Sequence, residues 1–159
     1  MKEQIQTNPQ THLELEDGSR FSGTRFGADL DTSGEVVFTT AMVGYPESLT
    51  DPSYFGQILV FTYPLIGNYA VPDTGERQHG IKKFLESEKI QVRGVIVSEY
   101  CMDASHHRKH TTLDEWLKEN QIPGLVNVDT RSLTQTLRDK GVALGRISDS
   151  RGSTYFDPN

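Results

Sequence analysis

Cysteine is nearly absent from this sequence, positive charge is in deficit, and long apolar runs are missing. The single cysteine, Cys101, excludes an internal disulfide and a cysteine-rich zinc site. The formal net charge of -6 provides no basic field that would gather phosphates, so we expect no nucleic-acid partner. No apolar run approaches the roughly 20 residues that span a bilayer, so we expect no membrane association.

Familiar catalytic and targeting motifs are also missing. The 14 glycines form neither a Walker pattern nor a dinucleotide-binding pattern. Ser53 lacks the Gly-x-Ser-x-Gly frame that exposes a nucleophilic serine, and no pair of carboxylates can be given acid and base roles from its spacing. Residues 1–11 are polar and resemble neither a signal peptide nor a transit peptide. We interpret them as a flexible tail and expect a cytoplasmic protein.

The remaining features are those of one globular domain. A chain of 159 residues is long enough to bury a hydrophobic core but too short for two ordinary domains. Apolar residues make up 35% of the chain, charged residues 24%, and the mean hydropathy is -0.53, which is typical of a soluble folded protein. One fold must therefore account for the whole chain.

Alternating and β-branched segments predict several strands. Residues 12–16 and 20–26 alternate polar and apolar side chains around Asp17-Gly18, which predicts a hairpin because this dipeptide tolerates the positive φ of a tight turn. Pro123-Gly124 is expected to form a turn before another strand. Further strands are expected where β-branched and other apolar residues predominate, at residues 36–40, 57–63, 92–98, 125–128 and 142–147.

Helical patterns are confined to the second half of the chain. A short amphipathic helix is expected within residues 80–87, because apolar residues recur there at helical spacing. Residues 112–115 form a capping-box pattern at the start of a second helix. A third helix is expected to begin at Asp129 or Thr130 and to end at Gly141.

The order of these elements predicts an α/β domain. The early hairpin favours antiparallel pairing, whereas the strand-helix-strand order between residues 58 and 128 favours parallel strands joined by crossovers. We therefore expect a layered domain with one antiparallel sheet, one mixed or parallel sheet, and helices on one side.

The segment most suited to a function is a turn-rich connector at residues 44–57. Pro46 and Pro52 each lack an amide hydrogen and disfavour a helical conformation in the preceding residue, so only a short helical turn around residues 47–49 is expected. Residues 50–53 predict a turn with Pro52 at its second position, in which an Asp or Ser side chain can bond to a free amide. Such a turn would hold its side chains firmly at the surface.

A histidine cluster offers a competing hypothesis. His106 and His110 would lie one turn apart on a helix and could share a metal ion, as in a small metal-dependent hydrolase. However, Arg108 and Lys109 lie between them, no acidic or cysteine partner is fixed nearby, and the local pattern is that of a loop. A solvated loop is the favoured interpretation, and we expect no metal site.

Several blocks of sequence resemble one known family. They are Leu-Glu-Leu-Glu-Asp-Gly at 13–18, Gly-Glu-Val-Val-Phe at 34–38, Gly-Tyr-Pro-Glu at 44–47, Leu-Thr-Asp-Pro-Ser-Tyr at 49–54, Thr-Tyr-Pro-Leu-Ile-Gly-Asn-Tyr at 62–69, Asp-Thr-Arg-Ser-Leu-Thr at 129–134 and Arg-Asp-Lys-Gly at 138–141. Over about residues 12–147 they resemble the amino-terminal domain of the small, glutamine-hydrolysing subunit of carbamoyl-phosphate synthetase. The blocks at 44–47 and 62–69 are most similar to the version in multifunctional eukaryotic pyrimidine-synthesis enzymes and some bacterial relatives.

The resemblance implies an activity shared with other parts of an enzyme. The parent enzyme of this family is a ligase that hydrolyses glutamine in a class I amidotransferase domain. It passes the ammonia to a large subunit, which uses ATP and magnesium to make carbamoyl phosphate for arginine or pyrimidine biosynthesis. In this family the present domain has a layered β/β/α fold and largely docks the small subunit on the large one. The implied partners are the large subunit in a heterodimer, the amidotransferase domain and glutamine, with no cofactor in this fragment.

The resemblance assigns a role to one residue. The serine of Thr-Asp-Pro-Ser-Tyr, Ser53, is expected to hydrogen-bond the glutamine substrate across the boundary with the amidotransferase domain. No catalytic residue is carried over, because the cysteine, histidine and glutamate of the triad belong to the amidotransferase domain. Cys101 lies in Glu-Tyr-Cys-Met-Asp, which is unlike the glycine-rich elbow of that nucleophile.

The resemblance also implies a division of the chain. We expect a flexible tail at residues 1–11, the small-subunit amino-terminal domain at 12–150, and the start of a linker to the absent amidotransferase domain at 151–159. On this interpretation the chain is a truncated or separately encoded piece that is inactive alone. The alternative is a free-standing protein-interaction or regulatory module with the same fold.

Overall fold

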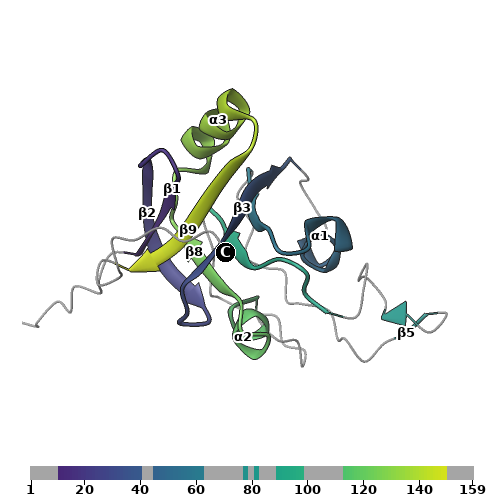
Figure 1. Cartoon of the computed structure of the whole chain (residues 1–159). Helices are drawn as coiled ribbons and strands as arrows, with labels where there is room; N and C mark the ends of the chain where they lie inside the picture. The colour runs from purple at the N-terminus through teal and green to yellow at the C-terminus, as the bar shows by residue number, and fades with distance from the viewer. Residues whose placement is uncertain are drawn as a thin grey trace, which may run out of the picture.

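Seven strands close into a barrel in the computed structural model, which describes residues 11–40, 45–62, 77–78, 81–82, 89–98 and 113–149. The order around the barrel is β1-β2-β8-β7-β4-β3-β9, and Figure 1 shows β9 running between β1 and β3. The barrel strands are β1 (Thr11–Leu15), β2 (Arg20–Gly27), β3 (Thr32–Thr39), β4 (Ile58–Phe61), β7 (Gly94–Ile96), β8 (Pro123–Val126) and β9 (Ala143–Asp149). The helices are α1 (Tyr45–Thr50), the 3-10 helix η1 (Pro52–Tyr54), α2 (Leu113–Glu119) and α3 (Thr130–Lys140). Within the described ranges, no helix has the length and apolar character needed to cross a membrane.

The predicted hairpin forms the first two strands. β1 and β2 pair antiparallel, and the chain reverses at residues 16–19. Gly18 has a φ of 92°, and the Asp17 carboxylate accepts a hydrogen bond from the Ser19 amide at 2.9 Å. Glycine adopts a positive φ without steric cost, and aspartate bonds to its own turn, so this dipeptide fixes the reversal where the sequence predicted it.

β9 joins the antiparallel strands to the parallel ones. It pairs antiparallel with β1, where Thr11 lies opposite Asp149, and antiparallel with β3, where Val36 lies opposite Ala143. β3, β4, β7 and β8 then run parallel, and β8 pairs antiparallel with β2. Both predicted kinds of pairing are therefore present in a mixed α/β fold.

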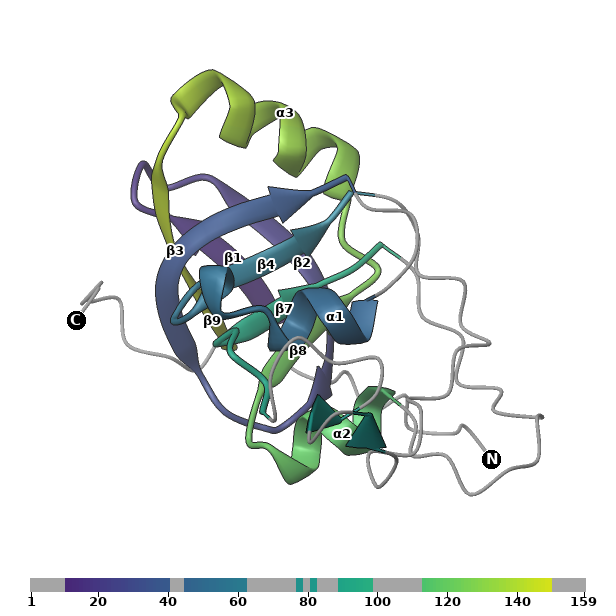
Figure 2. The same cartoon turned by 90° about the vertical axis from the view of Figure 1, so that its right-hand side faces the viewer.

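The prediction of two layered sheets with helices on one side is wrong. β9 bonds to both β1 and β3, and β8 bonds to both β2 and β7, so the strands form one closed surface. Closure satisfies the backbone groups that two sheets would leave free at their edge strands. The helices also lie apart from one another: α3 covers one end of the barrel, α1 lies on its flank, and α2 lies away from α3 (Figure 2).

One apolar cluster fills the interior of the barrel. Ile58 and Val60 of β4 belong to it, whereas the two residues that alternate with them belong to a second, outer cluster, so the predicted strand at β4 is buried on both faces. Leu133 and Leu137 of α3 complete the interior cluster. Its other buried members are Leu13, Leu15, Val36, Ile96, Leu125, Val128, Ala143 and Ile147.

The outer cluster attaches α1 and α2 to the barrel. Leu113, Trp116 and Leu117 are the buried residues of α2. They belong to the same buried cluster as Leu49 of α1 and Phe26 of β2. Because burial of apolar surface is the dominant favourable term in folding, these contacts fix the positions of both helices.

The two ends of α3 follow the sequence prediction. Asp129 caps the helix, and its Oδ1 accepts a hydrogen bond from the Ser132 amide at 3.0 Å. At the other end Gly141 has a φ of 79°, and its amide donates to the Leu137 carbonyl oxygen. The cap satisfies one of the free donors of the first turn, and the left-handed glycine ends the helix without steric cost.

The turn predicted at Pro123-Gly124 is wrong, because both residues lie in β8. Pro123 occupies the first position of the strand, where a missing amide hydrogen is tolerated. Gly124 is required by a close neighbour, since a Cβ at this position would lie 2.5 Å from Cε1 of Phe26. The glycine that suggests a turn in the sequence therefore makes room for an aromatic ring of the adjacent strand.

The helix predicted within residues 80–87 is also wrong where the structure describes it. Ile81–Lys82 forms the short strand β6, which pairs with β5 (Arg77–Gln78). The pairing partner lies outside the segment from which the helical spacing was read, so the sequence pattern did not include it. The rest of the predicted helix lies outside the described residues.

The start of β3 lies against the connector that precedes β4. A Cβ on Gly34 would lie 2.7 Å from the carbonyl oxygen of Gly56, closer than real Cβ atoms approach. Gly56 itself has a φ of 74°. The first position therefore requires glycine for space and the second for conformation, and together they hold the connector close to the barrel wall.

Leu133→Ala should destabilise the barrel strongly. Leu133 is 0% exposed in the interior cluster, and truncating such a leucine leaves a cavity that costs about 2–5 kcal/mol. Leu30→Ala is the matched control, because the same truncation at a side chain that is 46% exposed should change the free energy of unfolding by less than about 0.5 kcal/mol. Urea unfolding measures both values. Equal effects would contradict the role of α3 in sealing the barrel.

Gly34→Ala should separate β3 from the connector. The new Cβ would meet a backbone oxygen, which cannot swing away as the end of a side chain can, so we expect a loss of about 1–3 kcal/mol in the free energy of unfolding. Ser22→Ala introduces the same residue at an exposed strand position and should have little effect. Denaturant unfolding gives the stability, and hydrogen exchange at the Gly56 amide reports the local displacement. Native exchange at Gly56 in the Gly34 variant would show that the contact is not tight.

Candidate functional site

The connector between β3 and β4 contains two short helical pieces. Residues 45–50 form α1, and residues 52–54 form η1, so the short helical turn predicted around 47–49 is confirmed. Pro52 lies at the start of η1, where its ring fixes a suitable φ and its missing amide hydrogen is not needed. Asp51 before it is extended, with φ of -72° and ψ of 120°, as expected for a residue that precedes proline.

Ser53 lies in η1 with an exposed side chain. Its backbone amide donates a hydrogen bond to Oδ1 of Asp51 at 2.9 Å, which confirms the predicted bond between a turn side chain and a free amide. Within the described part of the chain, no hydrogen bond to its hydroxyl is formed. The hydroxyl is therefore presented to the solvent by a backbone that is itself held in place.

Buried residues at the end of α1 fix the upstream side of η1. Leu49 and Thr50 are both 0% exposed. The Thr50 hydroxyl donates to the Pro46 carbonyl oxygen at 2.8 Å and lies 3.3 Å from the Glu47 carbonyl oxygen. A buried hydroxyl without a partner would be costly, so these bonds allow the chain to enter the core before it turns out into η1.

Backbone hydrogen bonds tie both sides of η1 to the segment before β7. The Gln91 amide donates to the Leu49 carbonyl oxygen at 2.8 Å, and the Gly56 amide donates to the Gln91 carbonyl oxygen at 3.1 Å. The Arg93 amide then donates to the Gln57 carbonyl oxygen at 2.8 Å. These three bonds flank residues 50–55, so the exposed turn is anchored at both of its ends.

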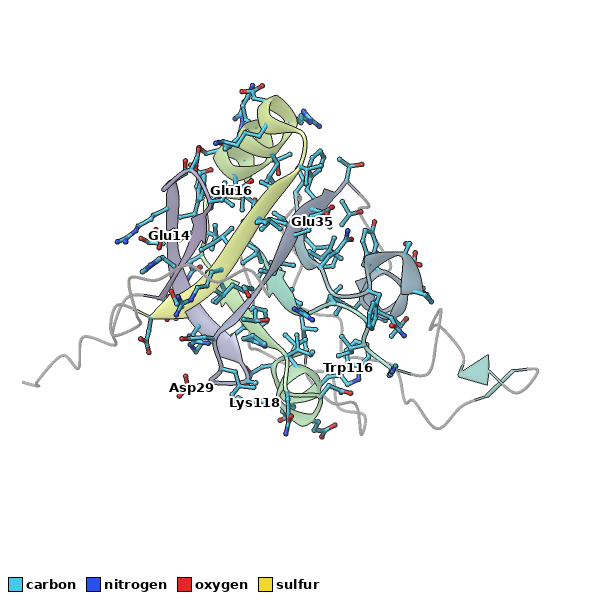
Figure 3. The ribbon with its side chains drawn as sticks, viewed as in Figure 1. Glu14, Glu16, Asp29, Glu35, Trp116 and Lys118 are labelled. Carbon is cyan, nitrogen blue, oxygen red and sulfur yellow. The ribbon has the colours of Figure 1, made fainter. Side chains whose placement is uncertain are left out.

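Polar side chains attach the same region to β3. Nε2 of Gln57 donates to Oε1 of Glu35 at 3.2 Å, and the Arg93 guanidinium donates to the Ser33 carbonyl oxygen at 3.2 Å. Figure 3 shows Glu35 on the part of β3 nearer to α1, whereas Glu14 and Glu16 lie on the hairpin side. One side chain next to this anchored region is left in solvent: Phe55 is 71% exposed.

The described residues around Ser53 offer hydrogen-bonding groups, and no histidine lies among them. His12 is the only histidine in the described part of the chain. It lies on β1, which β9 and β3 separate from β4, the strand that follows η1. No histidine in the described ranges is therefore placed to activate the Ser53 hydroxyl. The same residues contain no group of three or more His, Cys, Asp or Glu side chains that could hold a metal ion. The Ser53 hydroxyl is an uncharged donor and acceptor of hydrogen bonds on an anchored backbone.

The other candidates from the sequence cannot be placed. His106, His110 and Cys101 lie outside the described residues. The structure adds two features that the sequence analysis missed. These are the exposed Phe55, which no local pattern indicated, and the Gln57–Glu35 bond, which joins residues 22 positions apart and gives no local signal.

Comparison with known proteins identifies the family. The family model described as carbamoyl-phosphate synthase small chain, CPSase domain, matches residues 13–147. The chain is 52% identical over 149 residues to multifunctional protein ura1 of Schizosaccharomyces pombe. The aligned region covers 92% of this chain and 7% of that protein. It is 52% identical over 136 residues to the carbamoyl phosphate synthase small chain of Pyrococcus furiosus, and the alignment covers 86% of this chain and 36% of that small chain. It is 50% identical over 137 residues to the carbamoyl phosphate synthase arginine-specific small chain of Candida albicans, and the alignment covers 86% of this chain and 32% of that small chain.

These relatives are longer than the chain. It spans about a third of the two small chains and less than a tenth of the multifunctional protein. The match nevertheless runs from β1 to β9 and includes the connector with Ser53. The resemblance seen in the sequence blocks is thus confirmed, and the chain belongs to the carbamoyl-phosphate synthase small-chain family, of which it represents the CPSase domain.

Proposed function

We propose that this domain belongs to a glutamine-dependent carbamoyl-phosphate synthetase, in which it lends Ser53 to the glutamine site and docks the small subunit on the large one. The observation that carries the proposal is the exposed Ser53 hydroxyl on a turn that is anchored at both ends, in a chain of the small-chain family. An exposed hydroxyl on an anchored backbone is suited to binding a small polar ligand.

Glutamine fits the chemistry of this residue. The free amino acid is a zwitterion, so it offers an ammonium group that donates hydrogen bonds and a carboxylate that accepts them. A serine hydroxyl can bond to either group without adding net charge to the site. Its contribution is to positioning, and a hydrogen bond to a charged group is worth roughly 1.5–3 kcal/mol.

The hydrolysis of glutamine is assigned to another part of the enzyme. In this proposal Ser53 binds the substrate and does not attack it. In this proposal a class I amidotransferase domain supplies the cysteine, histidine and glutamate. The large subunit uses ATP and magnesium to combine the ammonia into carbamoyl phosphate, so no cofactor is assigned to this domain.

The pathway follows from the proposed product. One relative is named as arginine-specific and another as a multifunctional protein, so carbamoyl phosphate made with this domain would serve arginine or pyrimidine synthesis. We place the enzyme in the cytoplasm. A free-standing interaction or regulatory module remains the competing function, and the two differ in whether a change at Ser53 affects the use of glutamine.

Ser53→Ala should weaken the use of glutamine in the complete enzyme. Loss of one hydrogen bond to a charged group should raise the KM for glutamine about tenfold or more, with little change in kcat. Synthesis from added ammonia should remain at the wild-type rate, because that route bypasses the glutamine site. Steady-state kinetics with each nitrogen donor measures both effects.

Ser132→Ala is the matched control for that change. Ser132 is exposed and its amide also bonds to an aspartate, but it lies at the start of α3, which follows β8, whereas η1 precedes β4. Because β4, β7 and β8 are parallel, the two serines lie at opposite ends of these strands. Unchanged glutamine kinetics in Ser53→Ala, or an equal change in Ser132→Ala, would contradict the proposed role of Ser53.

The isolated domain should release no ammonia from glutamine. In our proposal the nucleophile and its base lie in the amidotransferase domain, so the activity should depend entirely on that domain. Incubation of the purified chain with glutamine, followed by an ammonia assay, tests this expectation. Measurable hydrolysis that follows the protein through purification would contradict the assignment.

A further inference from the structure

We propose that Asp51 is a positioning residue for glutamine, because its carboxylate fixes the backbone that presents the Ser53 hydroxyl. The inference rests on the proposed function, since it requires that Ser53 binds the substrate. It goes further in naming the residue on which the geometry of Ser53 depends.

Asp51 bonds to η1 through both its side chain and its backbone. Its Oδ1 accepts from the Ser53 amide at 2.9 Å, and its carbonyl oxygen accepts from the Tyr54 amide at 3.0 Å. Its own amide donates to the Ser48 carbonyl oxygen at 3.3 Å, which connects it to α1. Asp51 therefore links the buried end of α1 to the exposed turn.

The side-chain bond matters because the backbone bonds that anchor the turn lie on either side of Ser53, and none of them is made by the Ser53 amide. The helix is three residues long and none of its residues is buried. Pro52 has no amide hydrogen, so the Ser53 amide is the first donor of the turn, and no intrahelical acceptor exists for it. Without the carboxylate, the Ser53 amide would lose this partner, so the peptide between Pro52 and Ser53 and the hydroxyl beyond it would be less restrained.

The other aspartate cap in the domain provides an internal comparison. Oδ1 of Asp129 accepts from the Ser132 amide at 3.0 Å at the start of α3. α3 has 11 residues, and Leu133 and Leu137 anchor it in the interior cluster. Loss of that cap should lower stability while packing keeps the helix in place. In η1 only Tyr54 packs, partly buried, against the outer cluster, while Pro52 and Ser53 are exposed. The same loss there should therefore change the position of Ser53.

A carboxylate could also act on a charged ligand through its charge. Asp51→Asn separates the two roles, because asparagine keeps a side-chain oxygen that can accept from the Ser53 amide and is equally effective as a helix cap. If Asp51 acts as a cap, Asn should preserve its function and Ala should not.

The experiment uses the complete glutamine-dependent enzyme with the variants Asp51→Ala, Asp51→Asn, Asp129→Ala, Ser53→Ala and the double variant of Asp51 and Ser53. Asp51→Ala should raise the KM for glutamine about three- to tenfold, with kcat and the ammonia-dependent rate unchanged. Asp51→Asn should stay within about twofold of wild type. Asp129→Ala should lower the melting temperature and leave the KM unchanged.

The double variant tests whether Asp51 acts through Ser53. Once the hydroxyl is gone, its position no longer matters, so Asp51→Ala should add nothing to the KM of Ser53→Ala. The inference would be overturned if the double variant raised the KM by the product of the two single effects. It would also be overturned if Asp51→Asn raised the KM as much as Asp51→Ala. A raised KM in Ser53→Ala with a normal KM in Asp51→Ala would overturn the inference alone and leave the proposed function standing. A normal KM in Ser53→Ala would overturn both.

Discussion

The fold depends on the pairing of β9 with two different strands. β9 lies antiparallel to β1 on one side and to β3 on the other, and so joins the amino-terminal hairpin to the parallel strands. Without this strand, β1 and β3 would each expose an unpaired edge. The joined strands instead enclose an interior cluster that α3 covers, and the same closure allows a domain with few helices to bury a continuous core.

The position of the connector follows from that closure. β3 and β4 are adjacent and parallel, so the chain must return from the end of one to the start of the other, and α1 and η1 lie on this return path. The start of β3 then meets the connector at Gly34 and Gly56, and the segment before β7 meets it through backbone hydrogen bonds. The rigidity of the exposed serine therefore comes from the barrel wall, while its exposure comes from the short helix.

The features predicted from the sequence are those set by neighbouring residues. The Asp17-Gly18 reversal, the Asp129 cap and the turn after Asp51 each depend on side chains and backbone groups within a few positions of one another. Barrel closure was not predictable in this way, because β1 and β9 are separated by almost the whole described chain. Pro123-Gly124 was misinterpreted for a related reason: the pattern suggests a turn, but the ring of Phe26, far away in sequence, requires the glycine. The binding role of Ser53 came from family resemblance, since no spacing rule indicates an isolated serine.

The pairing of Thr11 with Asp149 brings the two ends of the barrel sequence together. A longer polypeptide can therefore enter and leave the domain at one point, as a loop does, without having to reach across it. The matching sequence makes up about a third of one small chain and 7% of one multifunctional protein, and adjacent ends suit a domain that occurs in proteins of such different length. The same arrangement has a mechanical consequence. Tension between the two ends would separate β1 from β9 one residue pair at a time, so the barrel would open first between these two strands.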